Sequence, residues 1–269
     1  MNQQIIENLP NYDYHCAKEY LEYISSSGLK TVLYNPFLFK WRRDLQIFKP
    51  PSKQQKLGSA LHTLALEPEN FERDVHVVPP NLNKRKKKDK EFYDEWEAEL
   101  LAKNKETIIL EEDQQEIVEQ VREKLEKNTE VLELLSDGVA ESSIFFEVGS
   151  AKYKVRPDYM RKDLIVDLKT TGKPLYDFGR SCVNYGYDLS AWFYCYGADI
   201  YNYKFLVIET IEPFSFGIFT PDKQFMATGK ARTLKAMKIY EECAKTNNWP
   251  EPKLNQSLSL PRWYQKQAA

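Results

Sequence analysis

The chain has 269 residues with 38 Lys+Arg against 40 Asp+Glu, so its formal net charge is −2, and 42% of its residues are hydrophobic. This composition is too apolar for a disordered chain, and no run approaches the roughly 20 apolar residues that a membrane span requires. The start, Met1-Asn2-Gln3-Gln4, lacks the basic and then apolar residues of a signal peptide. Four cysteines without a CxxC pair argue against a disulfide scaffold or a compact zinc module. We therefore expect a soluble cytoplasmic protein.

The first 135 residues are predicted to be mainly helical. Patterns of helical spacing occur at residues 28–33, 37–43, 54–66 and 87–135. Ser25-Ser26-Ser27 is a suitable N-cap for the first of these helices, and Asn35-Pro36 ends it and begins the second. Residues 74–78, which read Asp-Val-His-Val-Val, are typical of a short strand.

From residue 139 the pattern changes to one rich in strands. Strand-like runs lie at 143–148, 152–156, 164–169, 203–208 and 214–219, and helical runs at 174–184, 188–198 and 221–245. Gly149-Ser150 joins the first two strands as a hairpin. The sequence therefore predicts an α/β (α+β) fold. It forms a single domain over 1–269, with a helical part at 1–135, a sheet core at 139–245 and an irregular tail at 247–269.

Two acidic residues and a lysine lie near the ends of the second and third strands. Asp167 and Lys169 are two positions apart on a strand, so their side chains point to the same face, while Leu168 points into the apolar layer. Asp158 follows the second strand and reaches the same place if the second and third strands pair. The pattern thus predicts two carboxylates and one amine at one end of a sheet.

This group of side chains suits phosphodiester hydrolysis. Two carboxylates can hold Mg²⁺ while leaving positions for water and phosphate oxygens. A neighbouring lysine can orient or deprotonate the attacking water and offset charge on the phosphate. A bare Asp-x-Lys also occurs by chance as a surface salt bridge. The combination of Arg156-Pro157-Asp158 with Val166-Asp167-Leu168-Lys169, eight residues separating the two aspartates, is more specific.

The chain resembles the PD-(D/E)xK nucleases and, more narrowly, the RecE (exonuclease VIII)-type recombination exonucleases of phages and prophages. The segments that carry the resemblance are Ser25-Ser26-Ser27-Gly28-Leu29 with Asn35-Pro36, residues 57–68, Arg156-Pro157-Asp158, and residues 166–171 with Asn184-Tyr185-Gly186-Tyr187. They span residues 25 to 200, which is most of the chain. The resemblance implies a restriction-endonuclease-like core, with a mixed central sheet flanked by helices.

The resemblance also implies roles for individual residues. Asp158 and Asp167 would be metal ligands, joined by the main-chain carbonyl of Leu168, and Lys169 would be the catalytic lysine. His62 matches the histidine of a Gly-x-x-x-His helix that approaches the metal in this family. On its own sequence context, His62 could equally be a structural histidine beside a leucine stripe.

The chain departs from the family pattern at Ser190, and it offers two candidates for a further acidic ligand. Related nucleases often carry Gln-x-x-x-Tyr on the helix after the Asp-x-Lys strand, and here Ser190 and Tyr194 occupy those positions. A hydroxyl can still bond a phosphate or a water, but over a shorter reach. Glu141 and Glu147 are both candidates for an additional acidic ligand, with Glu141 preferred, and either could instead be an exposed strand residue.

Several cationic residues are candidates for contacts with DNA. Those near the predicted site in sequence are Arg156, Arg161, Lys173 and Arg180, while Ser190 and Tyr194 could assist them. The run Lys84–Lys90 holds six cations in seven positions, which suits phosphate contacts or, equally, a solvated helix start. Arg42-Arg43 follow an aromatic-rich helix and could hold an unpaired base, or could simply extend into solvent.

The resemblance implies a Mg²⁺-dependent exonuclease, with Mn²⁺ as a substitute, that digests linear double-stranded DNA from its ends in the 5′→3′ direction. The implied partners are DNA ends, a single-strand annealing protein of the RecT kind, and further copies of the chain in a closed ring, a tetramer being favoured. A bacterial cytoplasm, with phage or prophage origin, is the expected setting, without a membrane. An endonuclease on the same metal core is the alternative. An inactive DNA-binding module is a further one, against which the intact Asp158, Asp167 and Lys169 argue.

Overall fold

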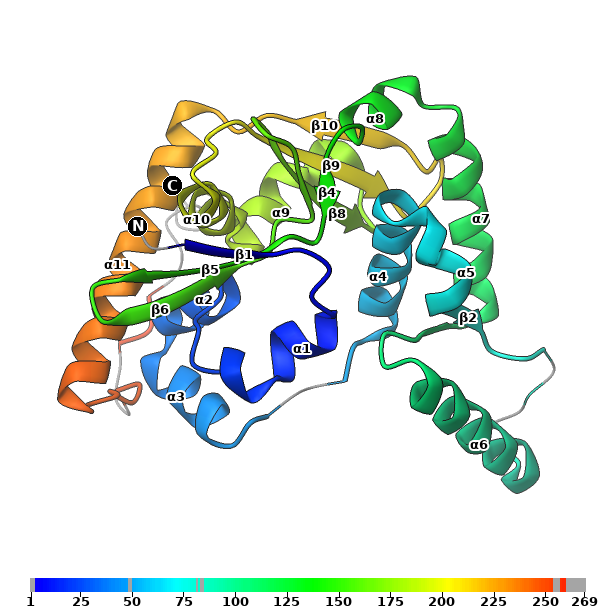
Figure 1. Ribbon diagram of the computed structural model, residues 1–269, viewed down its shortest axis with the longest axis horizontal. Coiled ribbons are helices and arrows are strands. Elements are labelled where there is room, and N and C mark those ends of the chain that lie inside the picture. Colours follow the sequence, from blue (N-terminus) through cyan, green and yellow to red (C-terminus); the bar gives the residue numbers. More distant parts are fainter. Residues whose placement is uncertain (1–2, 48–49, 81, 83–84, 254–256, 260–269) are drawn as a thin grey trace.

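Figure 1 shows the computed structural model, which describes residues 3–47, 50–80, 82, 85–253 and 257–259. Its helices are α1 (Asn11–Cys16), α2 (Ser26–Tyr34), α3 (Pro36–Asp44), α4 (Lys53–Leu66), α5 (Phe71–Asp74), α6 (Lys87–Lys103), α7 (Glu112–Glu126), α8 (Thr129–Leu134), α9 (Phe178–Tyr185), α10 (Tyr187–Ala198) and α11 (Lys223–Thr246). Its strands are β1 (Gln3–Ile6), β2 (Val75–Val77), β3 (Ile108–Leu110), β4 (Val139–Ala140), β5 (Ser143–Val148), β6 (Ala151–Val155), β7 (Tyr159–Met160), β8 (Ile165–Thr171), β9 (Tyr203–Glu209) and β10 (Phe216–Phe219).

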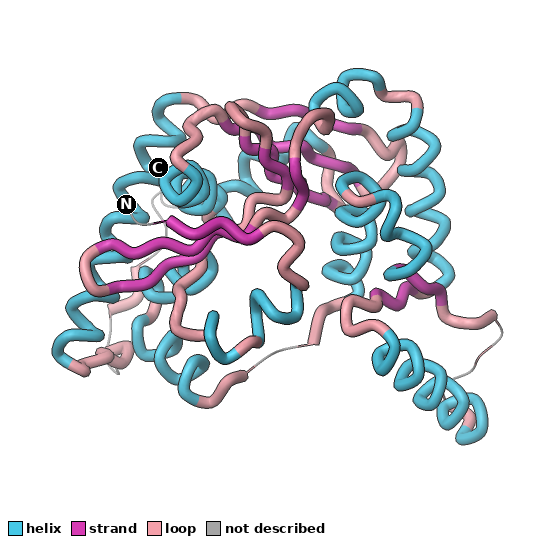
Figure 2. Tube along the Cα trace, viewed as in Figure 1, coloured by secondary structure: helices cyan, strands magenta, loops and turns pink. Residues whose placement is uncertain are grey.

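The central sheet has five strands in the order β10-β9-β8-β7-β4. β8 and β9 are parallel, with Asp167 opposite Phe205, and the other neighbours are antiparallel. The predicted mixed sheet is therefore confirmed, and Figure 2 shows its strands between helices.

The second and third strands of the sequence analysis do not pair, so the condition stated there for Asp158 is not met. The hairpin β5–β6 forms as expected, but it joins β1 in a separate three-stranded sheet. The chain leaves this sheet at Arg156-Pro157, and the short strand β7 then pairs with β8, placing Tyr159 opposite Val166. A proline has no N–H to donate to a strand ladder, so Pro157 is a suitable point for the chain to change sheets.

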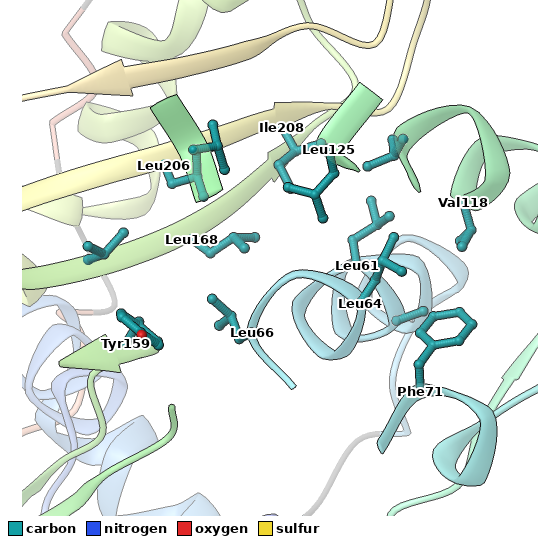
Figure 3. Packing of buried hydrophobic residues seen from close by; sticks show 14 of the residues in the cluster. Leu61, Leu64, Leu66, Phe71, Val118, Leu125, Tyr159, Leu168, Leu206 and Ile208 are labelled. Atoms are coloured by element: carbon teal, nitrogen blue, oxygen red, sulfur yellow. The ribbon is translucent and has the colours of Figure 1, made fainter. Parts of the chain in front are cut away.

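Alternate residues of β8 face two different apolar cores. Val166 and Leu168 pack against α4 and α7, and Figure 3 shows Leu168 and Leu206 facing Leu61 and Leu64 of α4. On the opposite face, Ile165 packs with residues of α9 and α10. Burial of such side chains contributes about 25 cal/mol per Å² of apolar surface, so both layers hold β8 in a fixed register.

A third core fills the space between the β5–β6 hairpin and three helices. Ile144, Phe146 and Tyr153 of the hairpin are almost completely buried against residues of α2, α10 and α11. Helix α10 also contributes to the core beneath the central sheet. Helix α10 is therefore buried on most sides and packs against both the three-stranded sheet and the central sheet. This packing fixes the end of the β5–β6 hairpin relative to β8.

Most of the predicted elements are confirmed within one to four residues at their ends. The charged stretch 87–135 is not all helix, because β3 interrupts it and pairs in parallel with β2. The strand β1 and helix α1 were not predicted. Of the tail, residues 247–253 and 257–259 contain no helix or strand, and the remainder lies outside the described residues. Lys84 of the cationic run also lies outside them.

The described part of the chain holds no helix that is long and apolar enough to cross a membrane. All four cysteines are free thiols, and three of them, Cys182, Cys195 and Cys243, are buried.

Candidate metal and catalytic site

Asp158 lies outside the paired strands, but its side chain is hydrogen-bonded to the middle of β8. Its Oδ2 atom accepts a hydrogen bond of 2.7 Å from the main-chain N–H of Leu168. Its own carbonyl oxygen accepts one of 3.0 Å from the N–H of Glu141. The two bonds bring the segments at 141, 158 and 168 together, so the convergence expected from strand pairing is reached through β7 instead.

Asp167 and Lys169 share one face of β8, as their spacing predicts. The Lys169 ammonium forms an ion pair with Asp167 Oδ2 and lies 3.6 Å from Asp158 Oδ2. It also donates a 3.1 Å hydrogen bond to the carbonyl oxygen of Leu168, the atom implied as a metal ligand. These three contacts hold the lysine near the middle of β8, whereas the side chain of Leu168 lies in the core on the other face.

His62 reaches this place from α4. The helix begins with a capping box in which Ser52 and Gln55 bond each other's main chain, which fixes its first turn. A Cβ atom at Gly58 would lie 3.2 Å from Thr170 Oγ1, so the glycine permits a close approach of α4 to β8. One helical turn later, His62 Nδ1 lies 4.0 Å from Asp158 Oδ2.

Glu141, and not Glu147, completes the cluster. Ligand atoms of His62, Glu141 and Asp158 all lie within 4.8 Å of one another. Glu141 has a left-handed backbone with φ of 50°, directly after β4. Glu147 is exposed and lies opposite Lys152 near the tip of the β5–β6 hairpin, outside this cluster.

The ionisation of these groups reflects burial and an excess of carboxylates. Burial, followed by repulsion from Asp158, raises the pKa of Glu141 to about 8. Burial likewise raises the pKa of Asp158, and raises that of Asp167 to about 6 even though Lys169 opposes the shift. Burial lowers the pKa of Lys169, but Asp167 and Asp158 outweigh it and the net shift is upward. The site therefore holds an ammonium beside carboxylates that resist ionisation.

The imidazole of His62 is neutral in this environment. Burial, followed by repulsion from Lys169, lowers its pKa to about 4. A neutral imidazole has a lone pair for coordination, whereas an imidazolium does not.

The donor set fits a divalent cation. Carboxylate oxygens are the ligands preferred by Mg²⁺, and a mixed oxygen and imidazole set also suits Mn²⁺. Burial raises the pKa values of Glu141 and Asp158 by disfavouring their charged forms, and a bound cation would favour those charged forms again. In addition, Asp167 Oδ2 is buried without a hydrogen-bonded partner, although the Lys169 ammonium lies beside it. His62, Glu141 and Asp158 would hold the ion, with Asp167 adjacent.

Sequence reasoning missed two residues beside the site, Tyr187 and Lys30. The centroid of the Tyr187 ring lies 5.4 Å from Lys169 Nζ and 5.6 Å from Lys30 Nζ. Burial lowers the pKa of Lys30 to about 8, against a smaller upward effect of Asp167. Tyr187 belongs to the Asn-Tyr-Gly-Tyr segment noted above. Gly186 is left-handed there, with φ of 61°, and turns α9 into α10 so that Tyr187 faces β8.

Tyr194 and Ser190 both lie on α10 beneath the site. Burial, followed by the charges of Asp167 and Asp158, raises the pKa of Tyr194, and its hydroxyl bonds Ser26. Ser190 is buried one turn earlier, at 6% exposure. The structure thus brings Tyr194 close to the carboxylates and places Ser190 in the interior.

The structure does not present Arg156 to a phosphate, contrary to the sequence prediction. Its side chain is 6% exposed, and its guanidinium bonds Glu141, Asn11 and Leu9. Arg161 lies in the turn before β8, at the end of the strand opposite Lys169, and reaches Glu133 O at 3.4 Å. Lys173 and Arg180 are exposed just after β8, where Arg180 lies 3.7 Å from Asp177.

Comparisons with known proteins agree with this architecture. The crystal structure of a protein from Eubacterium rectale, whose given name proposes an exonuclease, matches with a TM-score of 0.62 at 14% identity, covering 98% of this chain and 99% of that one. The structure of SSO0001 matches 51% of this chain and 69% of its own at 13% identity, and its TM-score of 0.30 is too low to support an argument. No curated protein matches the sequence.

A family model described as "PDDEXK-like domain of unknown function (DUF3799)" matches residues 25–254. This range contains the whole cluster from His62 to Lys169 and both helices that carry Tyr187 and Lys30. The match covers most of the chain, and the chain therefore belongs to this PDDEXK-like family.

Proposed function

We propose that the protein is a Mg²⁺-dependent exodeoxyribonuclease that digests linear double-stranded DNA from its ends, in the 5′→3′ direction. The observation that carries the proposal is the meeting of Asp158, Asp167 and Lys169 at the middle of β8, with His62 and Glu141 beside them. The family match supports a nuclease site, and the name of the Eubacterium rectale protein supports action at ends.

The chemistry assigns different tasks to the acidic residues and to the lysine. A bound divalent cation supplies an acidic water and neutralises charge on the phosphate. The raised pKa of Lys169 keeps its ammonium charged at neutral pH, so it serves as a hydrogen-bond donor and positive charge near the reacting phosphate, not as a base. Asp167 and Asp158 hold this ammonium in place through their ion pairs.

Exposed cations around the site are suited to hold the DNA backbone. Lys173 and Arg180 are exposed after β8, and the half-buried Lys30 lies 5.6 Å from the Tyr187 ring centroid. Such contacts position a duplex without reading its sequence. This supports an enzyme that acts on ends of any sequence. From the resemblance to RecE-type exonucleases, the proposal includes a bacterial cytoplasm as the setting and an annealing protein of the RecT kind as partner for the 3′ strand.

We also propose that the enzyme is a closed ring of identical subunits, with four favoured by the resemblance to RecE-type exonucleases. Exposed apolar side chains on and before α9 support an interface, with Tyr176 at 86%, Val183 at 76% and Tyr185 at 63% exposure. A ring around the duplex would give processivity to a chain of small net charge. Light scattering at micromolar concentration tests this, and a monomer mass would remove the ring while leaving the site.

Digestion of a linear duplex with labelled 5′ or 3′ ends, in Mg²⁺, tests the function directly. We expect early release of the 5′ label and a shrinking duplex that leaves a 3′ strand. A covalently closed circle of the same sequence is the matched control and should remain intact. Cutting of the circle would replace the proposal with an endonuclease, and equal digestion in excess EDTA would overturn the metal mechanism.

A further inference from the structure

Arg156 connects the acidic cluster to the first residues of the chain. Its Nε atom donates a 3.0 Å hydrogen bond to the carbonyl oxygen of Glu141 and lies 3.3 Å from Glu141 Oε2. Its Nη1 atom donates to Asn11 Oδ1 at 3.2 Å, and its Nη2 atom donates to the carbonyl oxygen of Leu9. The planar guanidinium therefore spans from residues 9–11 to Glu141.

The N-terminal segment, residues 3–24, packs against the β5–β6 hairpin, and Arg156 directly follows this hairpin in the sequence. β1 pairs with β5 over four residues, and Ile24 forms a bridge to Tyr153. The buried Lys154 ammonium donates to the carbonyl oxygens of Tyr14 and Tyr20, at 2.5 and 3.1 Å. The Tyr14 ring, which is 4% exposed, lies 4.5 Å from Lys154 Nζ and 4.7 Å from the Arg156 guanidinium carbon.

Glu141 needs such support because its local backbone does not hold it. It follows a strand of two residues and has a left-handed conformation, which is unfavourable for a residue with a side chain. Its main chain is bonded on one side to Asp158 and on the other to Arg156. Outer groups that bond a ligand in this way orient it and affect metal affinity.

We propose that Asn11 and Tyr14 are positioning residues for the metal ligand Glu141 and act on it through Arg156. The proposal rests on the proposed metal site. It assigns a part of the site to a segment that lies entirely before residue 25, where the family match begins. Asn11 orients the guanidinium by a hydrogen bond, and the Tyr14 ring packs against it.

Titration of the full-length protein with Mn²⁺, followed by electron paramagnetic resonance without DNA, measures the effect on the metal directly. We expect Arg156→Gln to weaken Mn²⁺ binding by about 10-fold or more, within the range for removal of an outer group. Asn11→Ala should weaken it by about 3-fold, because the guanidinium then has one hydrogen bond fewer. Arg156→Lys should recover little, since an ammonium cannot reproduce the planar fork.

The double variant separates positioning from general destabilisation. If Asn11 acts through Arg156, then Asn11→Ala should have no further effect on Mn²⁺ affinity in the Arg156→Gln background. Arg43→Gln is the matched control, because Arg43 also bonds the N-terminal segment, at Glu22 O, but does not touch the cluster. It should leave Mn²⁺ affinity unchanged.

A third variant distinguishes failure of this inference from failure of the proposed metal site. Asp158→Asn removes a ligand itself and should weaken Mn²⁺ binding whether or not Arg156 matters. If Asp158→Asn weakens binding and Asn11→Ala does not, the positioning role is overturned and the metal site stands. If neither changes Mn²⁺ affinity, the metal site itself is misassigned. Should Arg156→Gln fail to fold, Asn11→Ala at its exposed position still decides the question.

Discussion

The acidic cluster and helix α6 both contain many charged residues, but these residues have opposite surroundings. The cluster consists of His62, Glu141, Asp158, Asp167 and Lys169. On α6, lysines pair with acidic residues one turn away, as in Lys90–Asp94 at 2.5 Å and Lys103–Glu99 at 2.6 Å, and every residue is at least partly exposed. Figure 1 shows α6 projecting from the body of the molecule. In the cluster, three carboxylates converge on one ammonium and one neutral imidazole in a largely buried place.

The two regions differ in whether their charges are balanced. The charged side chains of α6 are paired and exposed, whereas the buried carboxylates of the cluster would be stabilised by a bound cation. Each exposed lysine named above on α6 already has an acidic partner one turn away and is surrounded by water, so its charge is balanced locally. In the cluster, burial raises the pKa values of Glu141 and Asp167, and repulsion from Asp158 adds to both shifts. Changes in the cluster should therefore alter activity strongly, and matched changes on α6 should alter it little.

Replacement of Lys169 by Met should have the largest effect. Methionine is an unbranched side chain that reaches as far as the lysine Cε atom but lacks the ammonium that pairs with Asp167 and Asp158. Loss of such an electrostatic group costs about 10²–10³-fold in rate, and we expect at least this loss in single-turnover cleavage of a linear duplex. Lys103→Met, which removes a paired lysine from α6, is the control and should retain full activity. Near-normal turnover of Lys169→Met would show that the Asp-x-Lys assignment is mistaken.

Asp167→Asn should weaken metal binding and cleavage together. The substitution removes a buried negative charge adjacent to the proposed metal ligands and leaves the Lys169 ammonium paired with Asp158 alone. We expect Mn²⁺ affinity, measured by calorimetry, to fall about 10-fold or more. Asp94→Asn on α6 breaks an exposed pair of similar length and should leave the affinity unchanged. If both variants bind Mn²⁺ like the original protein, Asp167 lies outside the metal's influence.

The sequence was sufficient to predict the residues of the site whose positions follow from local pattern. Asp167, Leu168 and Lys169 lie as strand alternation requires, and Gly58 and His62 are fixed by helical spacing. The position of Asp158 was predicted for the wrong reason, because β7 and not β6 pairs with β8. Local pattern contains no information on which sheet a short strand joins.

Other features depended on contacts between distant parts of the chain. Arg156 looked like a phosphate ligand because of its place in the motif, but its partners at Leu9 and Asn11 lie some 145 residues away. Lys30 and Tyr187 meet across α2 and α10, and neither has a distinctive spacing. The strand β3 was missed because three residues are too few to interrupt a helical pattern.

Stability without metal should fall as pH rises from 6.5 to 8. The pKa of Glu141 is raised to about 8 in the folded protein, so its contribution to stability is present at low pH and is lost as pH rises through that value. The pKa of His62 is lowered to about 4, so the contribution of His62 to stability is lost only as the pH falls below 6.5. The pKa of Lys30 is lowered to about 8, so Lys30 affects the pH dependence of stability only above pH 8. We expect a loss of about 1–2 kcal/mol, or 2–6 °C in Tm.

Calorimetry at pH 6.5 and pH 8, with and without Mg²⁺, measures this change. Mg²⁺ should restore Tm at pH 8, because the cation favours the ionised carboxylates. Glu141→Gln should remove most of the pH dependence, while Glu99→Gln, an exposed change on α6, should keep it. An unchanged Tm across this range in the metal-free protein would contradict the assignment of excess buried charge to Glu141.

The smallest effect should come from the cationic start of α6. Lys86, Lys87 and Lys88 are exposed there, and Lys87 lies 3.8 Å from Glu91, so part of this charge is already balanced within the helix. If these lysines still displace counterions from DNA, replacing all three by Gln should lower affinity only a few-fold. The slope of log Kd against log salt should fall by up to about 0.9 for each phosphate that a lysine no longer neutralises.

The matched control is a triple Gln replacement on α11, at Lys230, Lys235 and Lys238, which are also exposed. Both variants are best measured in the Lys169→Met background, where DNA is bound without being digested. A slope that is the same in both triple variants and in the parent would mean that the run is a solvated helix start. Its lysines would then make no contact with DNA phosphates, like the paired lysines on the rest of α6.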